Sequence, residues 1–262
     1  MSLSASKTLL IDAGNSRFKW ALAQDSSLTE NGSALYQQDA LSQQLQECWA
    51  SFTQADKCPQ RVLLCNVAAP RFAEAVMQWA ASFPCRGGVL PVVETVLAQA
   101  RAFGVTNAYV YPERLGADRW AALVAARRYI EGAACVVDVG TALTVDVLSA
   151  EGVHRGGIIV PGMKLMKQSL IDNTAAIAAD DRAAAATLGN DTPSAVQAGV
   201  LAAAAGAVTQ VMQAARAELG TELTVVVTGG DALPLLAVLP AELRHEPDWV
   251  LRGLAVIAEA EQ

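Results

Sequence analysis

Residues 8–23 read TLLIDAGNSRFKWALA, and this stretch decides the fold. An apolar run ends at Asp12, a short turn follows, and apolar and polar side chains then alternate from Arg17 to Leu22. Successive side chains of a β-strand point to opposite faces of the sheet, so this alternation is typical of a strand. The stretch therefore predicts a strand, a tight turn and a second strand.

A second copy of this plan occurs near the middle of the chain, where residues 134–148 read ACVVDVGTALTVDVL. Both stretches share an apolar run, an Asp-x-Gly-(Asn or Thr) turn and an alternating strand. Each is followed later by another apolar run that leads into a helix, at residues 62–66 and 224–228. The sequence predicts an α/β protein of two similar lobes, residues 1–115 and 116–262, with a cleft between them.

Periodicity and terminal residues predict four helices. They begin near Ala117, after Gly162, at Pro193 and at Trp249. The third is expected to have Thr192 as its N-cap and Pro193 in its first turn, and to end at Gly220. Its Gly199 and Gly206 lie two turns apart on one face, which permits close packing of another helix.

The composition describes a globular protein and excludes several classes of function. Of the 262 residues, 53% are hydrophobic and 17% are charged, which is typical of a folded chain. No apolar run approaches the ~20 residues of a membrane span, so no membrane partner is expected. The net charge is −7 and no cluster of Lys and Arg occurs, which argues against a nucleic-acid partner.

The cysteines and the N-terminus favour a cytoplasmic protein. The five cysteines are odd in number and form no Cys-x-x-Cys pair, which suits a reducing compartment. Cys65 and Cys135 lie in apolar runs, where cysteine is usually a small buried hydrophobe. Residues 1–7 contain no apolar core of signal-peptide length.

The first candidate site is the turn after Asp12. Gly14 lets backbone N–H groups approach phosphate oxygens, Asp12 is suited to Mg²⁺, and Lys19 can reach a phosphate. Taken alone, an ordinary hairpin is the better interpretation, because Asp, Gly and Asn are favoured in turns. The second copy at Asp138–Thr141 favours phosphate binding, since two such turns can hold both ends of a nucleotide phosphate tail.

Another pair of glycines, Gly229-Gly230, follows the predicted strand that ends at Thr228. Glycines there would let a nucleoside lie against the backbone, although alone they fit a plain strand-to-helix turn better. The sequence contains neither the Gly-x4-Gly-Lys-(Ser/Thr) motif of a P-loop nor the Gly-x-Gly-x-x-Gly motif of dinucleotide-binding folds.

A third candidate site, Pro112–Trp120, places Asp118 and Arg119 at the start of a predicted helix. A carboxylate there can accept a proton from an alcohol during phosphoryl transfer, and Arg119 can bind a carboxylate or phosphate. On chemistry alone, a role as helix N-cap explains Asp118 equally well.

The two histidines do not indicate a catalytic or metal site. His154 follows a turn and His245 lies in a polar stretch, and neither has a Cys or acidic partner at metal-ligand spacing. Both are expected at the surface. A histidine-based triad or zinc site is therefore not predicted.

Five of these stretches, in this order, resemble the type III pantothenate kinases. They span almost the whole chain, and the Gly-Ala-Asp-Arg motif beside two Asp-x-Gly turns is quite specific. Ser16 stands where the family often has Thr, and the hydroxyl is kept. The stretches are Asp12–Lys19, Glu113–Trp120, Asp138–Ala142, Gly156–Gly162 and Thr228–Gly230.

The resemblance implies two ribonuclease-H-like lobes, as in actin, Hsp70 and the acetate and sugar kinases. It implies ATP-dependent phosphorylation of pantothenate to 4′-phosphopantothenate, the first step of coenzyme A biosynthesis. The physical chemistry is consistent with this reaction. A primary alcohol as acceptor needs a positioned carboxylate, and ATP with Mg²⁺ as donor needs acidic residues and backbone N–H groups.

The resemblance also implies roles for single residues. Asp118 is expected to accept the proton, and Asp138 to help bind a monovalent cation, K⁺ or NH₄⁺. Mg²⁺ at Asp12 is expected from the chemistry of its carboxylate. The residues expected to contact ATP are Asp12, Ala13, Gly14, Asn15, Ser16, Arg17, Phe18, Lys19 and Thr141. Those expected to line the pantothenate pocket are Tyr109, Gly116, Ala117, Asp118, Arg119 and Thr192.

A homodimer whose interface helps to form the pantothenate site is implied too. Two alternatives stay open at this point. One is a kinase or phosphatase of the same fold that acts on another small alcohol or phosphate, against which the Gly116–Arg119 motif argues. The other is a regulatory accessory protein, because some relatives are called Bvg accessory factor. Intact Asp12, Asp118 and Asp138 argue against lost catalysis, and the pI of about 4.9 argues against DNA binding.

Overall fold

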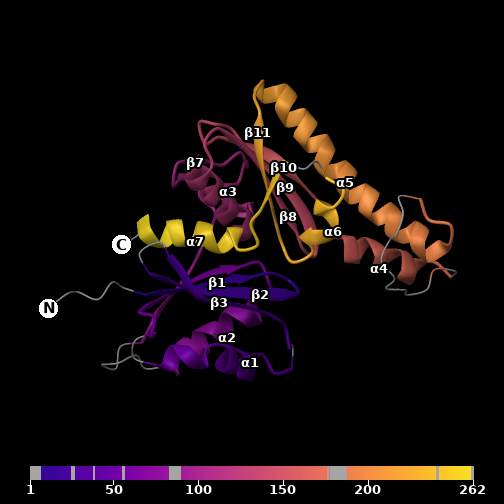
Figure 1. Ribbon diagram of the computed structural model, residues 1–262. Coiled ribbons are helices and arrows are strands. Elements are labelled where there is room, and N and C mark those ends of the chain that lie inside the picture. Colours follow the sequence, from indigo (N-terminus) through magenta and orange to yellow (C-terminus); the bar gives the residue numbers. More distant parts are fainter. Residues whose placement is uncertain are drawn as a thin grey trace. The chain divides into compact units, whose positions relative to one another are not determined.

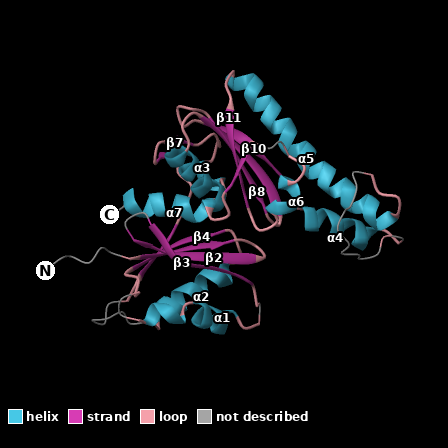
Figure 2. Ribbon diagram, in the orientation of Figure 1, coloured by secondary structure: helices cyan, strands magenta, loops and turns pink. Residues whose placement is uncertain are grey.

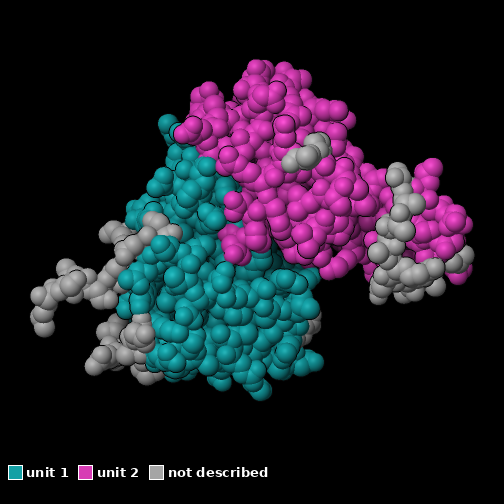
Figure 3. Space-filling model, viewed as in Figure 1, with its two compact units in different colours: residues 1–129, 249–262 teal, residues 130–248 magenta. Residues whose placement is uncertain are grey.

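The computed structural model describes residues 7–24, 27–37, 39–54, 57–82, 90–175, 177, 188–239 and 242–260. Contacts divide the chain into two compact units, coloured separately in Figure 3. The first comprises Met1–Tyr129 and Trp249–Gln262, and the second comprises Ile130–Asp248. Each unit is built on one five-stranded sheet.

The first sheet has the strand order β3-β2-β1-β4-β5 (Figure 1). β1, β2 and β3 run antiparallel to their neighbours, whereas β1, β4 and β5 are parallel. The quoted N-terminal stretch forms β1 and β2, as predicted. The strands are β1 Thr8–Ala13, β2 Arg17–Gln24, β3 Ser27–Leu35, β4 Arg61–Asn66 and β5 Val92–Thr95.

The second sheet repeats this arrangement with the order β10-β9-β8-β11-β12. Strands β8, β9 and β10 are again antiparallel to their neighbours, and β11 and β12 again run parallel to β8. Each strand thus corresponds to one strand of the first sheet, which confirms the predicted internal repeat. The strands are β8 Ala133–Val139, β9 Ala142–Leu148, β10 His154–Pro161, β11 Leu223–Thr228 and β12 Leu243–His245.

Helices cover the sheets and include the four that the sequence predicts (Figure 2). A short hairpin of β6 and β7 and two 3₁₀ turns complete the described elements. The α-helices are α1 Leu41–Cys48, α2 Pro70–Ala81, α3 Ala117–Tyr129, α4 Met163–Asn173, α5 Thr192–Leu219, α6 Ala232–Leu236 and α7 Trp249–Ala260. The short elements are η1 Ala50–Thr53, β6 Arg101–Ala102, β7 Val105–Thr106 and η2 Pro112–Arg114.

An aromatic cluster fills the space between the first sheet and helices α1 and α2. Phe18 packs at 5.4 Å from Phe72 and at 6.1 Å from Trp49, measured between ring centroids. Trp49 in turn meets Trp79 edge-on at 4.8 Å. Burying such rings is strongly favourable, so this cluster fixes the start of β2 and the turn that precedes it.

The last helix, α7, packs in the first unit although it comes from the far end of the chain. It contacts α3 and strand β1. The indole N–H of Trp249 donates to the carbonyl of Ala122 at 3.1 Å, and Gly253 allows the two helix backbones to meet at Ala121. The predicted second lobe, residues 116–262, includes both α3 and α7. By contacts, both lie in the first unit, because α7 covers the apolar residues of α3.

Helix α5 packs one stripe of residues onto the second sheet. Val200, Ala204, Val208 and Met212 are buried at a spacing of four residues, and the last three belong to the core of that unit. By length and composition alone, α5 is apolar enough to cross a membrane. Its buried stripe nevertheless packs against the second sheet, as in the core of a globular protein.

Both ends of α5 have capping groups, and the N-terminal one differs from the prediction. Asp191, and not Thr192, is the N-cap: its carboxylate accepts from the Ser194 N–H at 2.9 Å and forms a capping box with Ser194. Thr192 is the first helical residue. Gly220 ends the helix in the left-handed conformation, with φ of 61°, as predicted.

The structure shows which cysteines are buried and which is in a disulfide. Cys65 and Cys135 are fully buried, which confirms their interpretation as core residues, and burial raises the pKa of the Cys135 thiol to about 12. Cys48, Cys65 and Cys135 are not part of a disulfide, whereas Cys58 is disulfide-bonded. The reducing compartment stays a prediction.

Candidate active site

The turn between β1 and β2 is closed by its glycine. The Gly14 N–H donates to the carbonyl of Arg17 at 3.0 Å, and a Cβ on Gly14 would approach that oxygen to 3.3 Å. Asn15 and Ser16 are exposed at the tip, while Ala13 and Phe18 on either side are buried. A buried base therefore presents an exposed polar backbone, which is the form that phosphate-binding turns take.

Asp12 and Lys19 are register partners across β1 and β2. Directly opposite residues of an antiparallel pair have their side chains on the same face, with Cβ atoms about 5 Å apart. Both are half-buried. The sheet thus brings together the carboxylate and the ammonium group that the sequence assigned to Mg²⁺ and phosphate.

Tyr36 supports the same turn and was missed by sequence reasoning. Its hydroxyl donates to the carbonyl of Gly14 at 2.7 Å, and its backbone N–H donates to Ser16. Burial raises the pKa of Tyr36, and the nearby charge of Asp12 raises it further, so the hydroxyl remains a donor. No local signal marks this residue, because the contact spans 22 positions.

The second turn joins β8 to β9, and loops from two other places pack on it. Its Gly140 N–H donates to Ala142 at 3.0 Å. Gly162, at the start of α4, donates its N–H to the Thr141 carbonyl at 2.8 Å. A Cβ on Gly162 would lie 2.0 Å from the Gly140 carbonyl, so only glycine fits there. The motif residues of this unit are therefore assembled around one turn.

Gly229 closes the other side of the same turn. It has φ of +97°, and a Cβ on it would lie 2.3 Å from the Val139 carbonyl and 2.6 Å from Oδ1 of Asp138. The backbone approaches this closely only because the residue has no side chain. Asp138, at the end of β8, thus faces the backbone of the Gly229-Gly230 turn.

An ion pair between α4 and α6 borders the glycine pair. Nζ of Lys164 lies 2.7 Å from Oδ1 of Asp231, whose N–H donates to the Val139 carbonyl. No local pattern predicts this pair, since 67 positions separate the partners. It ties two helix starts of the second unit together.

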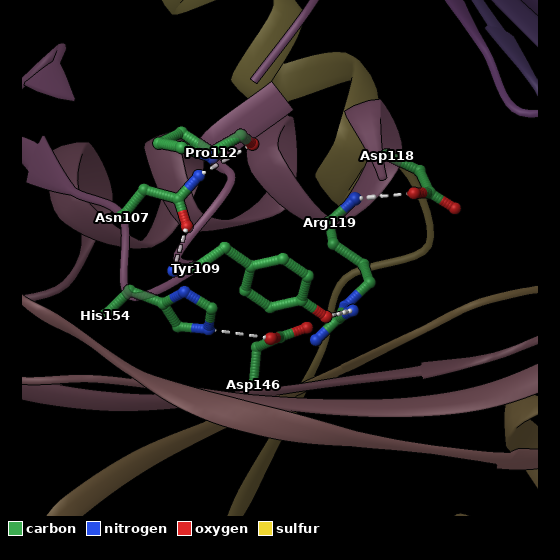
Figure 4. A network of polar contacts seen from close by, with 7 residues as sticks. All are labelled: Asn107, Tyr109, Pro112, Asp118, Arg119, Asp146 and His154. Carbon is green, nitrogen blue, oxygen red and sulfur yellow. Dashed lines mark hydrogen bonds and ion pairs between the residues drawn. The ribbon is translucent and has the colours of Figure 1, made fainter. Parts of the chain in front are cut away.

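The segment before α3 brings Tyr109 and Arg119 together, as Figure 4 shows. Nη1 of Arg119 donates to the Tyr109 hydroxyl at 2.7 Å, and the guanidinium carbon lies 5.5 Å from the ring centroid. Arg119 is only 6% exposed. A buried guanidinium needs partners, and Tyr109 supplies one.

Asp118 lies in the first turn of α3. The helix begins at Ala117, so Asp118 is its second residue and not the N-cap. Its Oδ1 accepts from the Arg119 N–H at 2.8 Å, and a Cβ on Gly116 would come within 2.6 Å of the same oxygen. The glycine of the Gly-Ala-Asp-Arg motif therefore makes room for the carboxylate.

The expectation for His154 was wrong, whereas His245 is exposed as expected. His154 is 1% exposed, and its Nε2 lies 2.9 Å from Oδ1 of the buried Asp146. The two residues lie on β10 and β9, which form a hairpin with an irregular register between His154 and Gly156. The pairing of β9 with β10 places Asp146 beside His154. In the sequence, only a turn before His154 was recognised.

Within each unit, then, most predicted site residues converge on the strand-end turns and the start of α3. Thr192 is exposed at the start of α5, away from these turns in the chain. No group of three or more metal-binding side chains occurs within the described part of the chain. The individual binding roles stay predictions.

Two units with the same strand order, each with an Asp-x-Gly turn after its first strand, define a protein of the actin-like and sugar-kinase fold. The profile of type III pantothenate kinase matches residues 8–214. A type III pantothenate kinase of Nitrosococcus oceani is 38% identical over 257 residues, which is 96% of this chain and 93% of the relative. The chain belongs to the type III pantothenate kinase family.

Solved structures agree on the fold. A Baf family protein of Campylobacter jejuni, described as a transcriptional activator, has a TM-score of 0.57 at 20% identity and covers 97% of this chain and 98% of its own. The ethanolamine utilization protein EutJ of Carboxydothermus hydrogenoformans has a TM-score of 0.55 at 14% identity, covering 98% and 91%. The activity follows from the family: the protein is a phosphotransferase that phosphorylates pantothenate with ATP.

Proposed function

We propose that Asp118 is the proton acceptor for the pantothenate hydroxyl and that Tyr109, Gly116, Ala117, Arg119 and Thr192 bind pantothenate. The observation that carries this proposal is the Arg119 N–H bond to Asp118. This bond fixes the carboxylate at the start of α3, beside a guanidinium suited to the carboxylate of pantothenate. A fixed carboxylate can take the proton while the alcohol attacks the γ-phosphoryl group.

Residues Asp12–Lys19 and Thr141 are proposed to bind ATP. The turn exposes Asn15 and Ser16, and Lys19 offers a positive charge beside Asp12. Asp12 is a hard oxygen ligand of the kind that Mg²⁺ prefers. When bound, Mg²⁺ neutralises the charge that develops on the transferred phosphoryl group.

Pantothenate-dependent release of ADP from ATP tests the assignment. Tyr109→Phe and Lys19→Ala are expected to separate the two substrates: the first raises KM for pantothenate and the second raises KM for ATP. If each variant changed both KM values equally, the division of residues between the substrates would be wrong.

A monovalent cation is proposed to bind at Asp138. The carboxylate faces the side-chain-free Gly229, so carboxylate and main-chain oxygens can surround a weakly hydrated ion. We expect turnover in KCl or NH₄Cl and little in NaCl at equal ionic strength. Asp138→Asn should lose this dependence together with activity. Equal rates in sodium and potassium would contradict the site.

A homodimer through α5 is also proposed. Gly199 and Gly206 are exposed on the side of α5 opposite its buried stripe, and a Cβ added to either would meet no other part of the chain within 4 Å. Thr192, a proposed pantothenate residue, begins the same helix. An exposed apolar helix face with room for close approach suits a second copy of the chain.

Gly206→Arg is expected to give a monomer that binds pantothenate at least ~10-fold more weakly while ATP binding changes little, because a buried charge at an interface is costly. Molar mass in solution and titration of both ligands measure this. Gln43→Arg, an exposed change on α1, is the control and should stay dimeric. A monomeric wild type with full activity would contradict the proposal, as would a monomeric variant with unchanged pantothenate affinity.

A further inference from the structure

One side chain closes the loop between β7 and η2. Oδ1 of Asn107 accepts from the Tyr109 N–H at 3.0 Å, and its Nδ2 donates to the Pro112 carbonyl at 3.1 Å (Figure 4). Its backbone N–H donates to Ala100 at 2.9 Å. A carboxamide has both an acceptor and donors, so Asn107 can bridge the two ends of the loop at once.

Apolar packing does little to hold this loop. Val110 is 87% exposed and Tyr111 is 58% exposed. Because these two side chains bury little apolar surface, the hydrophobic effect contributes little to the conformation of the loop. The loop is held mainly by hydrogen bonds. The two bonds from the Asn107 side chain span it from Tyr109 to Pro112.

Tyr109 in turn holds the end of the Arg119 side chain. Its hydroxyl accepts from Nη1 of Arg119, and the ring lies under the guanidinium. The Arg119 side chain is long and has many rotamers, so its position depends on the groups that hold its end. The backbone N–H of the same residue holds Asp118. Asn107, Tyr109, Arg119 and Asp118 therefore form one continuous chain of contacts.

We propose that Asn107 is a positioning residue for pantothenate: it fixes the backbone at Tyr109 and thereby the placement of the Arg119 guanidinium. The inference rests on the proposed roles of Tyr109 and Arg119. Asn107 itself touches no reacting atom in this scheme.

Asn107→Ala is expected to raise KM for pantothenate about 10-fold, because the bond it supports involves a charged group. KM for ATP should change less than about twofold, since the ATP turn lies on other strands. Asn107→Asp keeps the acceptor for the Tyr109 N–H and loses the donor to Pro112. Its effect should be smaller, at about threefold. Asn173→Ala, which removes an exposed side-chain bond at the end of α4, is the control and should match the wild type.

A double-mutant cycle with Tyr109→Phe separates positioning from general loss of structure. If Asn107 acts through the Tyr109 hydroxyl, Asn107→Ala should add less than about twofold in KM for pantothenate on the Tyr109→Phe background. Thermal unfolding of every variant is measured alongside. If Asn107→Ala unfolds well below the wild type, Asn107→Asp takes its place in the cycle.

Three results would overturn the inference. They are an unchanged KM for pantothenate in Asn107→Ala, full additivity with Tyr109→Phe, or an equal rise in KM for both substrates. If Tyr109→Phe alone leaves KM for pantothenate unchanged, the proposed role of Tyr109 fails as well. If Tyr109→Phe raises it and Asn107→Ala does not, only the role of Asn107 fails.

Discussion

Asp118→Asn is expected to fold like the wild type and to turn over pantothenate ~10²–10⁴-fold more slowly, the usual cost of losing a general base. The fold should survive because the asparagine oxygen can still accept the Arg119 N–H bond that Asp118 accepts at 2.8 Å. Only the ability to take a proton is lost. Turnover with saturating ATP and pantothenate, and thermal unfolding, give the two measurements.

Asp172→Asn is the matched control for this change. Asp172 is exposed on α4 and accepts a hydrogen bond from Gln168, so the same loss of charge occurs far along the chain from α3. It should leave turnover unchanged. Near-wild-type turnover in Asp118→Asn would show that another group accepts the proton or that none is needed.

Gly253→Ala is expected to lower the free energy of unfolding by about 3 kcal/mol or more, the upper range for overpacking a core. A Cβ on Gly253 would lie 1.9 Å from the Ala121 carbonyl oxygen and 2.5 Å from its carbon. Those atoms belong to a helix backbone, so α3 and α7 would have to move apart. The unfolding temperature should fall by about 6–12 °C for a chain of this size.

Glu259→Ala serves as the control on the same helix. Glu259 is exposed near the end of α7, and surface changes usually stay within about 0.5 kcal/mol. Unfolding of Gly253→Ala at the wild-type temperature would mean that the two helices do not meet at this glycine.

The sequence predicted those parts of the fold that local patterns encode. The strand–turn–strand stretches at Asp12 and Asp138 follow from alternation and from glycine at a tight turn, and both copies were found. Helix α5 was placed by Thr192 and Pro193 at its start and by Gly220 at its end. The N-cap was missed by one residue because Asp191 and Thr192 are both good capping residues. The bond to Ser194, which decides between them, is visible only in the folded chain.

Contacts between distant segments could not be predicted in this way. Tyr36 meets Gly14, and His154 meets Asp146, because strand pairing brings them together and not because of any spacing. The placement of α7 is a similar case. Its apolar pattern fits either lobe, and only its packing against α3 decides between them.

The return of α7 to the first unit has a consequence for synthesis of the protein. Chains emerge from the ribosome N-terminus first, and N-terminal domains usually fold while the rest is still being made. Here the first 129 residues share one unit with α7, whose buried residues Trp249, Leu254 and Ile257 contribute to its core, so that unit is complete only once α7 has been made. A polypeptide that terminates early, before Trp249, leaves the apolar side of α3 uncovered. Such a fragment would expose apolar surface of the kind that chaperones and proteases recognise.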